Sequence, residues 1–263
     1  KSNWHRELRK LAYSLDAMSK GLPLLYSIFG KEGNEKLPFV FFSALPQYTC
    51  PGAGDCLEWC YSFTGWRHVS PFVRQLLNTM LLRHAPEYIA SEWEKIPQNI
   101  EVRLYVDGDI DSAETMQFWF GLCKSRPDLH VYGYSKSWGL FIEHHQNGNS
   151  FPSNYVLNLS SGSKYENLPN YADAMEQLVR EDGKHLVRGY FVAVSIDSKG
   201  IPRGSERYSV TEYHQRVRNA AREQYGQVAF SCPGKCGSCP GQRQQCGLDR
   251  NINRMVLIAI GVH

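Results

Sequence analysis

Seven of the eight cysteines of this chain lie in two short segments, and thiolates grouped in this way are typical ligands of metal centres. The first segment has the spacing C-x5-C-x3-C, and the second has C-x3-C-x2-C-x6-C. Glycines between the cysteines allow the backbone to turn, so that several sulfurs can face one centre. The candidate ligands are Cys50, Cys56 and Cys60 in the first segment and Cys232, Cys236, Cys239 and Cys246 in the second.

Three interpretations of these cysteines compete. Disulfide bonds are not expected, because a chain of 263 residues can bury a large core without covalent cross-links. The sequence also indicates a reducing compartment. Zinc agrees with the C-x2-C pair of Cys236 and Cys239, which is common in zinc sites. An iron–sulfur cluster agrees with several thiolates in Gly- and Pro-rich loops that hold few other ligand types. We expect a [4Fe–4S] cluster and keep zinc as the alternative, because spacing alone does not separate the two.

A second set of candidate residues follows the predicted strands. Asp107 and Asp109 come directly after one strand, and Lys136 comes near the end of the next. Carboxylates at alternating positions can converge on a hard cation or a cosubstrate amine, and a lysine can bind an anion. The alternative is a polar turn, with Asp111 or Ser112 capping the next helix. If the protein is catalytic, Asp107, Asp109 and Lys136 are the expected substrate-side residues.

The elements that must position these residues alternate between short apolar strands and amphipathic helices, after a helical arm in residues 1–36. The predicted strands are 38–44, 102–106, 131–134, 155–159, 190–196, 228–230 and 255–261. The predicted helices are 70–96, 112–126, 140–145, 171–180 and 210–225. This order predicts one α/β domain over residues 1–263, whose mainly parallel sheet forms a partial or closed (β/α) barrel. A flat, doubly wound sheet is the alternative.

A barrel also accounts for where the cysteine groups lie in the chain. The first group follows the first predicted strand, and the second follows the penultimate one. Because the carboxyl ends of the strands build the site of such a barrel, we expect the two groups to meet there. Cys123 differs from the other cysteines, because it lies in the apolar face of the helix at 112–126, and we expect it to be a small core residue.

The composition limits the classes of protein. Hydrophobic residues make up 42% of the chain and charged residues 21%, with a net charge of +3, which argues against disorder and against a large nucleic-acid-binding arm. No apolar run approaches the roughly 20 residues that span a bilayer, and the first 20 residues lack the apolar core of an export signal. We therefore expect a cytoplasmic protein that does not contact a membrane, with nucleic acid not the expected partner.

Three motifs resemble a family of phage proteins, the gene product eighty-eight family. They are CPGAGDCLEWCY at residues 50–61, RLYVDGDIDSAETMQFWFGLCKSRPDLHVYGYSKS at residues 103–137 and a late KCGSC at residues 235–239. They occur in the family's order, and the likeness covers residues 38–246. The resemblance implies a phage protein in the cytoplasm of an infected host cell, with a metal or iron–sulfur centre at the cysteines and no established reaction.

The chain also resembles radical S-adenosylmethionine enzymes, which are partial (β/α) barrels with a three-cysteine loop after the first strand. The first cysteine group has that position, whereas the usual C-x3-C-x2-C spacing occurs here only in the second group. The resemblance implies a [4Fe–4S] cluster, with S-adenosylmethionine as cosubstrate where one iron is open. A cluster whose irons are all bound by cysteine would lack that activity.

These readings imply two kinds of partner. An iron–sulfur protein would interact with an electron-transfer partner or bind a small-molecule substrate. The alternative is a non-catalytic, zinc-stabilised module that contacts nucleic acid or a host protein through the basic C-terminal third of the chain.

Overall fold

Seven short strands of the computed structural model pair side by side in one sheet, and every pair of neighbours is parallel. The described residues are 3–30, 39–58, 60–202, 204–234, 239, 246 and 256–262. The strand order is β1-β2-β3-β4-β5-β7-β6, which places β1 and β6 at the two edges. The strands are β1 Val40–Phe41, β2 Glu101–Leu104, β3 His130–Ser135, β4 Tyr155–Ser160, β5 Val187–Ser195, β6 Phe230–Ser231 and β7 Val256–Val262.

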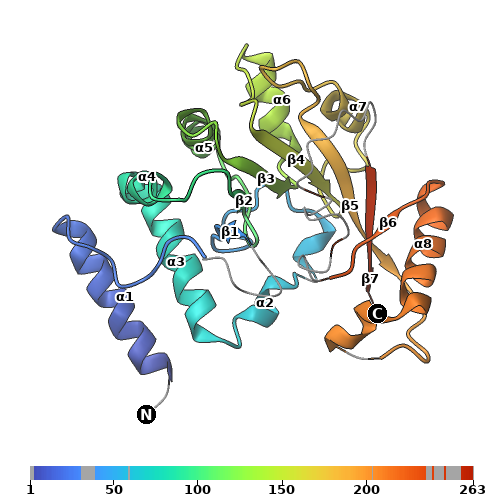
Figure 1. Cartoon of the computed structure of the whole chain (residues 1–263), viewed down its shortest axis with the longest axis horizontal. Coiled ribbons are helices and arrows are strands. Elements are labelled where there is room, and N and C mark those ends of the chain that lie inside the picture. The colour runs from blue at the N-terminus through green and yellow to red at the C-terminus, as the bar shows by residue number, and fades with distance from the viewer. Residues whose placement is uncertain are drawn as a thin grey trace.

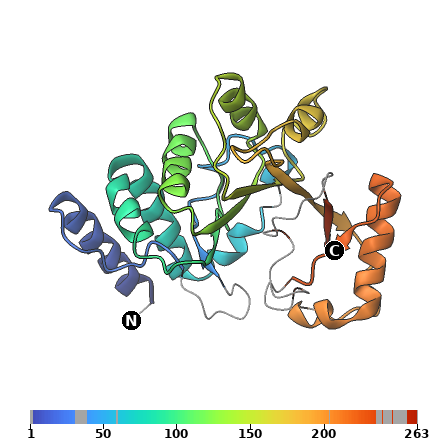
Figure 2. The same cartoon turned by 45° about the horizontal axis from the view of Figure 1, so that its top comes forward.

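Helices connect the strands from β1 to β6 and lie in an arc along one side of the sheet (Figures 1 and 2). Crossovers between parallel strands are almost always right-handed, so crossovers that advance in one direction place their helices on the same face of the sheet. The expected α/β fold with a parallel sheet and an N-terminal helix is thus confirmed, and the described strands form an open sheet rather than a closed barrel. The helices are α1 Asn3–Ser19, η1 Asp55–Leu57, α2 Ser62–Gly65, α3 Val69–His84, α4 Pro86–Trp93, α5 Ala113–Ser125, α6 Trp138–Gln146, α7 Tyr171–Glu176, η2 Gly204–Ser209 and α8 Thr211–Tyr225.

The predicted helix at 70–96 is two helices in the structure. α3 ends at His84 and α4 begins at Pro86, with Ala85 between them at φ −155°. A proline has no amide hydrogen and its ring clashes with the preceding turn, so it starts a helix better than it continues one. The apolar face runs through both helices, which is why periodicity alone does not reveal the break.

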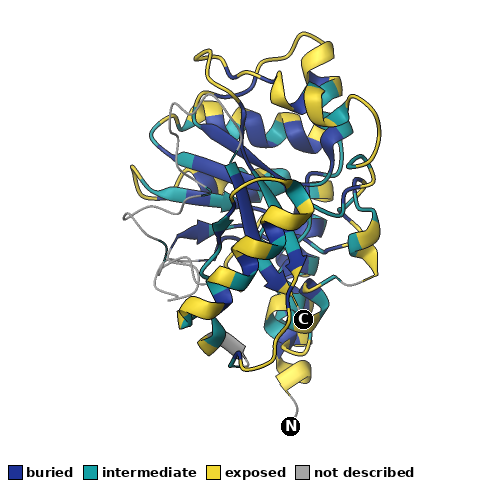
Figure 3. Ribbon diagram, turned by 90° about the vertical axis from the view of Figure 1, so that its right-hand side faces the viewer, coloured by how far each residue is buried: buried dark blue, intermediate teal, exposed yellow. Residues whose placement is uncertain are grey.

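Side chains alternate between the two faces of the sheet, and the two faces differ in character. Toward the helices, residues such as Val102, Val131 and Leu157 join a large apolar core, in which Cys123 is 0% exposed, as expected for a core cysteine. Figure 3 shows that the strands and the helix surfaces that face them are the most buried parts. No helix in the described ranges is long and apolar enough to cross a membrane.

The opposite side of the sheet, called here the inner face, is aromatic. Phe39, Tyr132 and Val156 form a cluster there, against which Tyr134 and Cys246 pack. The guanidinium of Arg103 lies 4.5 Å from the centre of the Tyr134 ring. A cysteine of the second group therefore lies on the inner face.

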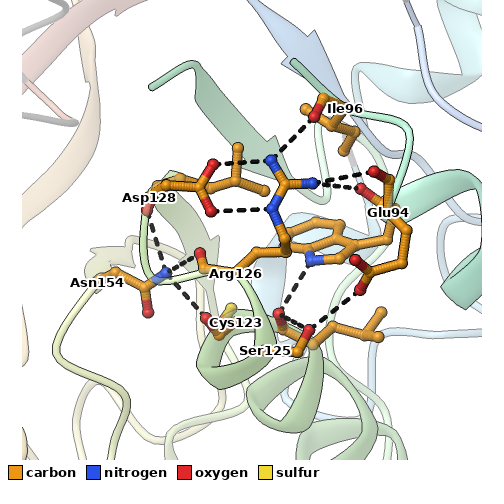
Figure 4. A network of polar contacts seen from close by, with 10 residues as sticks. Glu94, Ile96, Cys123, Ser125, Arg126, Asp128 and Asn154 are labelled. Atoms are coloured by element: carbon orange, nitrogen blue, oxygen red, sulfur yellow. Dashed lines mark hydrogen bonds and ion pairs between the residues drawn. The ribbon is translucent and has the colours of Figure 1, made fainter. Parts of the chain in front are cut away.

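A polar network at the far end of α5 joins the connections before β2, β3 and β4 (Figure 4). The guanidinium of Arg126 donates to the carbonyls of Trp93, Glu94 and Ile96 at 2.9–3.2 Å and pairs with Asp128. The amide of Asn154 donates to the carbonyls of Cys123, Arg126 and Leu129 at 2.9–3.1 Å. Two of these carbonyls also accept from backbone amides, Cys123 O from Arg126 N at 3.3 Å and Arg126 O from Leu129 N at 3.1 Å, so Asn154 adds a second hydrogen bond to each.

Replacing Asn154 by Ala should lower the free energy of unfolding by about 1–3 kcal/mol, because three partly buried carbonyls each lose a hydrogen bond. Urea denaturation followed by circular dichroism measures this change. The exposed Asn149, changed to Ala, is the matched control. An unfolding midpoint equal to that of the wild type would contradict the role given to Asn154.

A buried carboxylate fastens α1 to the following segment. Glu7, whose side chain is 2% exposed, accepts hydrogen bonds from the Tyr26 hydroxyl, from Arg6 Nε at 3.0 Å and from Lys10 Nζ at 3.4 Å. The bond from Tyr26, and then those from Arg6 and Lys10, lower the pKa of Glu7 from 4.5 to about 2 against the effect of burial. The ionised form of Glu7 is thus the one that stabilises the fold.

Because the folded pKa of Glu7 is depressed, its contribution should be complete above pH 4.5 and should disappear as the pH falls toward 2. The Glu7→Gln protein should be less stable than the wild type at pH 7 and should lose less stability between pH 5 and pH 2. Thermal unfolding at a series of pH values measures both effects. Parallel curves for the two proteins would refute this account.

Candidate metal centre at the carboxyl ends of the strands

The first cysteine group lies in the connection that leaves the carboxyl end of β1. The chain turns at Cys50, whose amide donates to Gln47 O at 3.2 Å and whose carbonyl accepts from Ala53 N at 3.1 Å. Cys56 belongs to the short helix η1, and Cys60 stands just before α2. We call residues 50–60 the cysteine loop.

Two neighbouring connections hold the cysteine loop in place. Ser163 Oγ bonds both the Gly52 carbonyl at 3.3 Å and the Lys136 carbonyl at 2.7 Å. Lys164 N donates to Gly52 O at 3.0 Å, and Gly54 N donates to Gly162 O at 2.9 Å. The connections after β3 and β4 thus flank the loop on the side between Cys50 and Cys56.

This packing requires glycine at position 52. A Cβ atom there would lie 2.0 Å from the Lys136 carbonyl oxygen and 2.5 Å from Ser137 Cα, and both are backbone atoms that cannot move aside alone. Gly54 is similar, because its Cβ would lie 2.8 Å from Lys164 N. The sequence indicates that these glycines help the loop to turn, whereas the structure shows that they also let two backbones touch.

The three cysteines of the cysteine loop are free and partly buried. Burial, together with the charges of Asp109, Cys56 and Cys60, raises the pKa of Cys50 to about 12. Burial also raises the pKa of Cys56, and the positive charge of Lys136 opposes this effect. The loop therefore disfavours bare thiolates, and a bound cation would reverse that preference.

Asp109 is buried beside this loop, with 4% of its surface exposed. Its Oδ2 accepts hydrogen bonds from Lys136 N at 2.8 Å and Ser137 Oγ at 3.1 Å, and its Oδ1 accepts from Ile110 N at 2.7 Å. Its own amide donates to Thr49 Oγ1 at 3.3 Å. Burial raises its pKa to about 6, although these hydrogen bonds oppose the shift.

Lys136 has its ammonium group at the same end of the sheet. Its Nζ donates to Ser160 Oγ at 2.6 Å, which joins the carboxyl ends of β3 and β4. An ammonium carries three protons, so this bond uses one of its donors. Of the three substrate-side candidates, Asp109 and Lys136 are thus brought together next to the cysteines.

Asp107 lies in a different environment, although it is only two residues from Asp109. Its carboxylate accepts hydrogen bonds from Ser62 Oγ at 2.6 Å, Gln75 Nε2 at 3.0 Å and Ser43 Oγ at 3.4 Å. These partners lie on β1's connection, α2 and α3. Asp107 therefore fastens the helices behind the cysteine loop to the end of β2.

The turn that follows supports the capping interpretation for its later residues. Ser112 caps α5 by accepting a hydrogen bond from Thr115 N at 3.1 Å, and Asp111 forms an ion pair with Arg83.

Within the described ranges, no group of three or more His, Cys, Asp and Glu side chains has the arrangement of a metal site.

The second cysteine group is described in part. Cys232 follows β6, and its amide donates to Ala259 O on β7 at 2.7 Å. Cys239 is half-buried, and the carbonyl of Cys246 accepts from Asn158 Nδ2 at 2.9 Å on the inner face of β4. Cys236 lies outside the described residues. The meeting of the two cysteine groups at one centre therefore stays a prediction.

Sequence reasoning missed the contacts of Ser160 and Ser163. The amides of the segment after β4 bond within the protein: Ser161 N donates to Phe191 O at 2.8 Å, and Gly162 N donates to Glu166 Oε2 at 2.6 Å. Ser160 Oγ accepts from the ammonium of Lys136 and Ser163 Oγ donates to its carbonyl, and these two bonds hold Lys136 against the cysteine loop. Only the pairing of β3 with β4 brings these segments together, so no local pattern could reveal it.

No curated protein and no solved structure matches this chain. A protein-family model described as Gene product 88 matches residues 24–239, which is most of its length and includes the cysteine loop. The likeness to radical S-adenosylmethionine enzymes stays a prediction. The match over so much of the chain shows that the protein belongs to the Gene product 88 family.

Proposed function

We propose that this protein of a phage family is an iron–sulfur protein that binds a [4Fe–4S] cluster and has a redox or cluster-dependent role in the host cytoplasm. One observation carries the proposal: three free, partly buried cysteines lie in one short loop, which the connections after β3 and β4 hold at Gly52 and Gly54. Cys50, Cys56 and Cys60 would supply three thiolate ligands. The fourth would come from Cys232, Cys236, Cys239 or Cys246.

The donor set fits a cluster on chemical grounds. Thiolates are the ligands of iron–sulfur clusters, and the metal replaces the proton of each thiol. Because burial raises the pKa of Cys50 and Cys56, protons compete with the metal for these sulfurs, and a bound cluster would have to compensate the thiolate charges within the loop. When bound, the cluster would supply one-electron chemistry, with an electron-transfer protein or a small molecule as partner.

The surrounding residues have separate tasks in this proposal. Ser163 and the two glycines hold the loop, and Asp109 holds the backbone of Lys136. The aromatic residues of the inner face, with Tyr134 next to Cys246, would limit the access of water. If one iron is open to S-adenosylmethionine, Lys136 is the substrate-side residue with hydrogen-bond donors left to offer.

Metal and acid-labile sulfide analysis of the anaerobically purified chain tests the proposal first. We expect iron and sulfide in equal amounts, about four of each per chain. Electron paramagnetic resonance spectra of the reduced protein, with and without S-adenosylmethionine, then distinguish an open iron from a fully ligated cluster. Zinc without sulfide would contradict the proposal and favour a zinc-stabilised module.

Substitutions in the cysteine loop test its role as the ligand loop. Changing Cys56 to Ser or Gly52 to Ala should lower the bound iron severalfold, because the first removes a ligand and the second forces the loop away from Lys136. Cys123→Ala is the matched control, since Cys123 lies in the apolar core. It should retain its iron at a cost of about 1 kcal/mol in stability. Full iron occupancy in Cys56→Ser would exclude Cys56 as a ligand.

A further inference from the structure

A half-buried lysine without a direct counter-ion lies at the carboxyl ends of β3 and β4. The amide of Lys136 donates to the Asp109 carboxylate at 2.8 Å, and its carbonyl accepts from Ser163 Oγ at 2.7 Å, so its backbone is fixed. Its ammonium donates to Ser160 Oγ at 2.6 Å and, among the residues that the structure describes, forms no ion pair with a carboxylate. A charge that is taken partly out of water is usually paired in proteins. Lys136 therefore presents a positive charge that an anion could compensate.

The contact between Lys136 and Ser160 leaves hydrogen-bond donors for such an anion. An ammonium has three protons, and the bond to Ser160 uses one of them. Ser160 accepts that bond, so the hydrogen of its own hydroxyl group can go to a further acceptor. Both residues are half-buried and lie beyond the carboxyl ends of parallel strands, where α/β sheets bind their ligands. An oxyanion at this place would accept hydrogen bonds from both side chains.

Two aromatic rings lie beside this polar pair on the inner face. Ser160 pairs with Phe191 in the register of β4 and β5, so their side chains point to the same face of the sheet. The centre of the Phe191 ring lies 5.4 Å from that of the Tyr134 ring, against which the guanidinium of Arg103 packs at 4.5 Å. Phe191 is half-buried, and a partly exposed ring can stack on a flat ligand. The inner face thus combines donors for an anion with an aromatic surface.

We propose that the carboxyl end of the inner face binds a nucleotide, with its phosphate at Lys136 and Ser160 and its base against Phe191. A nucleotide matches these surroundings because it carries a negative charge and a flat ring on one small molecule. The three residues belong to the ends of β3, β4 and β5, so the nucleotide would lie across neighbouring strands. The inference needs no metal at the cysteines and is independent of the proposed function.

Isothermal titration calorimetry of the full chain with adenosine 5′-monophosphate tests the inference. We expect binding that weakens as the salt concentration rises, because salt screens the charge of the phosphate. Lys136→Met should weaken the binding about tenfold, because a hydrogen bond between charged groups is lost. Lys124→Met, which removes a lysine of α5 that pairs with Glu181, is the matched control and should bind as the wild type does.

Two further variants separate the parts of the site. Ser160→Ala should bind adenosine 5′-monophosphate severalfold more weakly, and it decides the question if circular dichroism shows that Lys136→Met does not fold. Phe191→Leu should weaken the binding of adenosine 5′-monophosphate and leave that of ribose 5-phosphate, which has no base, unchanged.

Three results would overturn the inference. They are the absence of binding to the wild type, equal affinities of the wild type for the two compounds, and wild-type affinity in folded Lys136→Met or in Ser160→Ala. None of them bears on the proposed function, which the iron and sulfide analysis tests separately.

Discussion

The hydrogen bonds of the Asp109 carboxylate are the contacts on which the carboxyl end of the sheet depends. The carboxylate accepts from Lys136 N and Ser137 Oγ, while the amide of Asp109 donates to Thr49. A carboxylate buried to this degree is tolerated only when hydrogen bonds replace the water it has lost. Because Thr49, Asp109 and Lys136 follow β1, β2 and β3, this one residue links three connections that converge at the same end of the sheet. The position of the cysteine loop relative to Lys136 follows from that link.

The helices and strands could largely be predicted from the sequence where nearby residues mark their ends. The predicted strand at 155–159 is β4 Tyr155–Ser160, and the predicted helix at 112–126 is α5, which begins after its Ser112 cap. Apolar periodicity identifies both, because each element buries one face in the common core. It fails at Pro86, where two helices share one continuous apolar face.

The candidate site was predictable in its residue types and not in its contacts. Asp107 and Asp109 look equivalent in the sequence, yet the first bonds Ser62 and Gln75 whereas the second bonds the chain at Lys136. The hydrogen-bond partners of the two aspartates belong to segments that are distant in the sequence. These segments become neighbours only when the strands pair. The need for glycine at position 52 was equally hidden from the sequence, because the atom that leaves no room for a side chain there is the carbonyl oxygen of Lys136.

The order of the strands has a consequence for how the protein is made. β7 lies between β5 and β6 in the sheet, although it follows both in the chain, and the second cysteine group lies between β6 and β7 in sequence. On a ribosome, β6 therefore emerges before the strand that must bridge it to β5. The sheet is completed only after all seven clustered cysteines have been synthesised, because β7 follows the last of them in the chain. Every candidate ligand is therefore already present in the nascent chain when the last strand takes its place in the sheet.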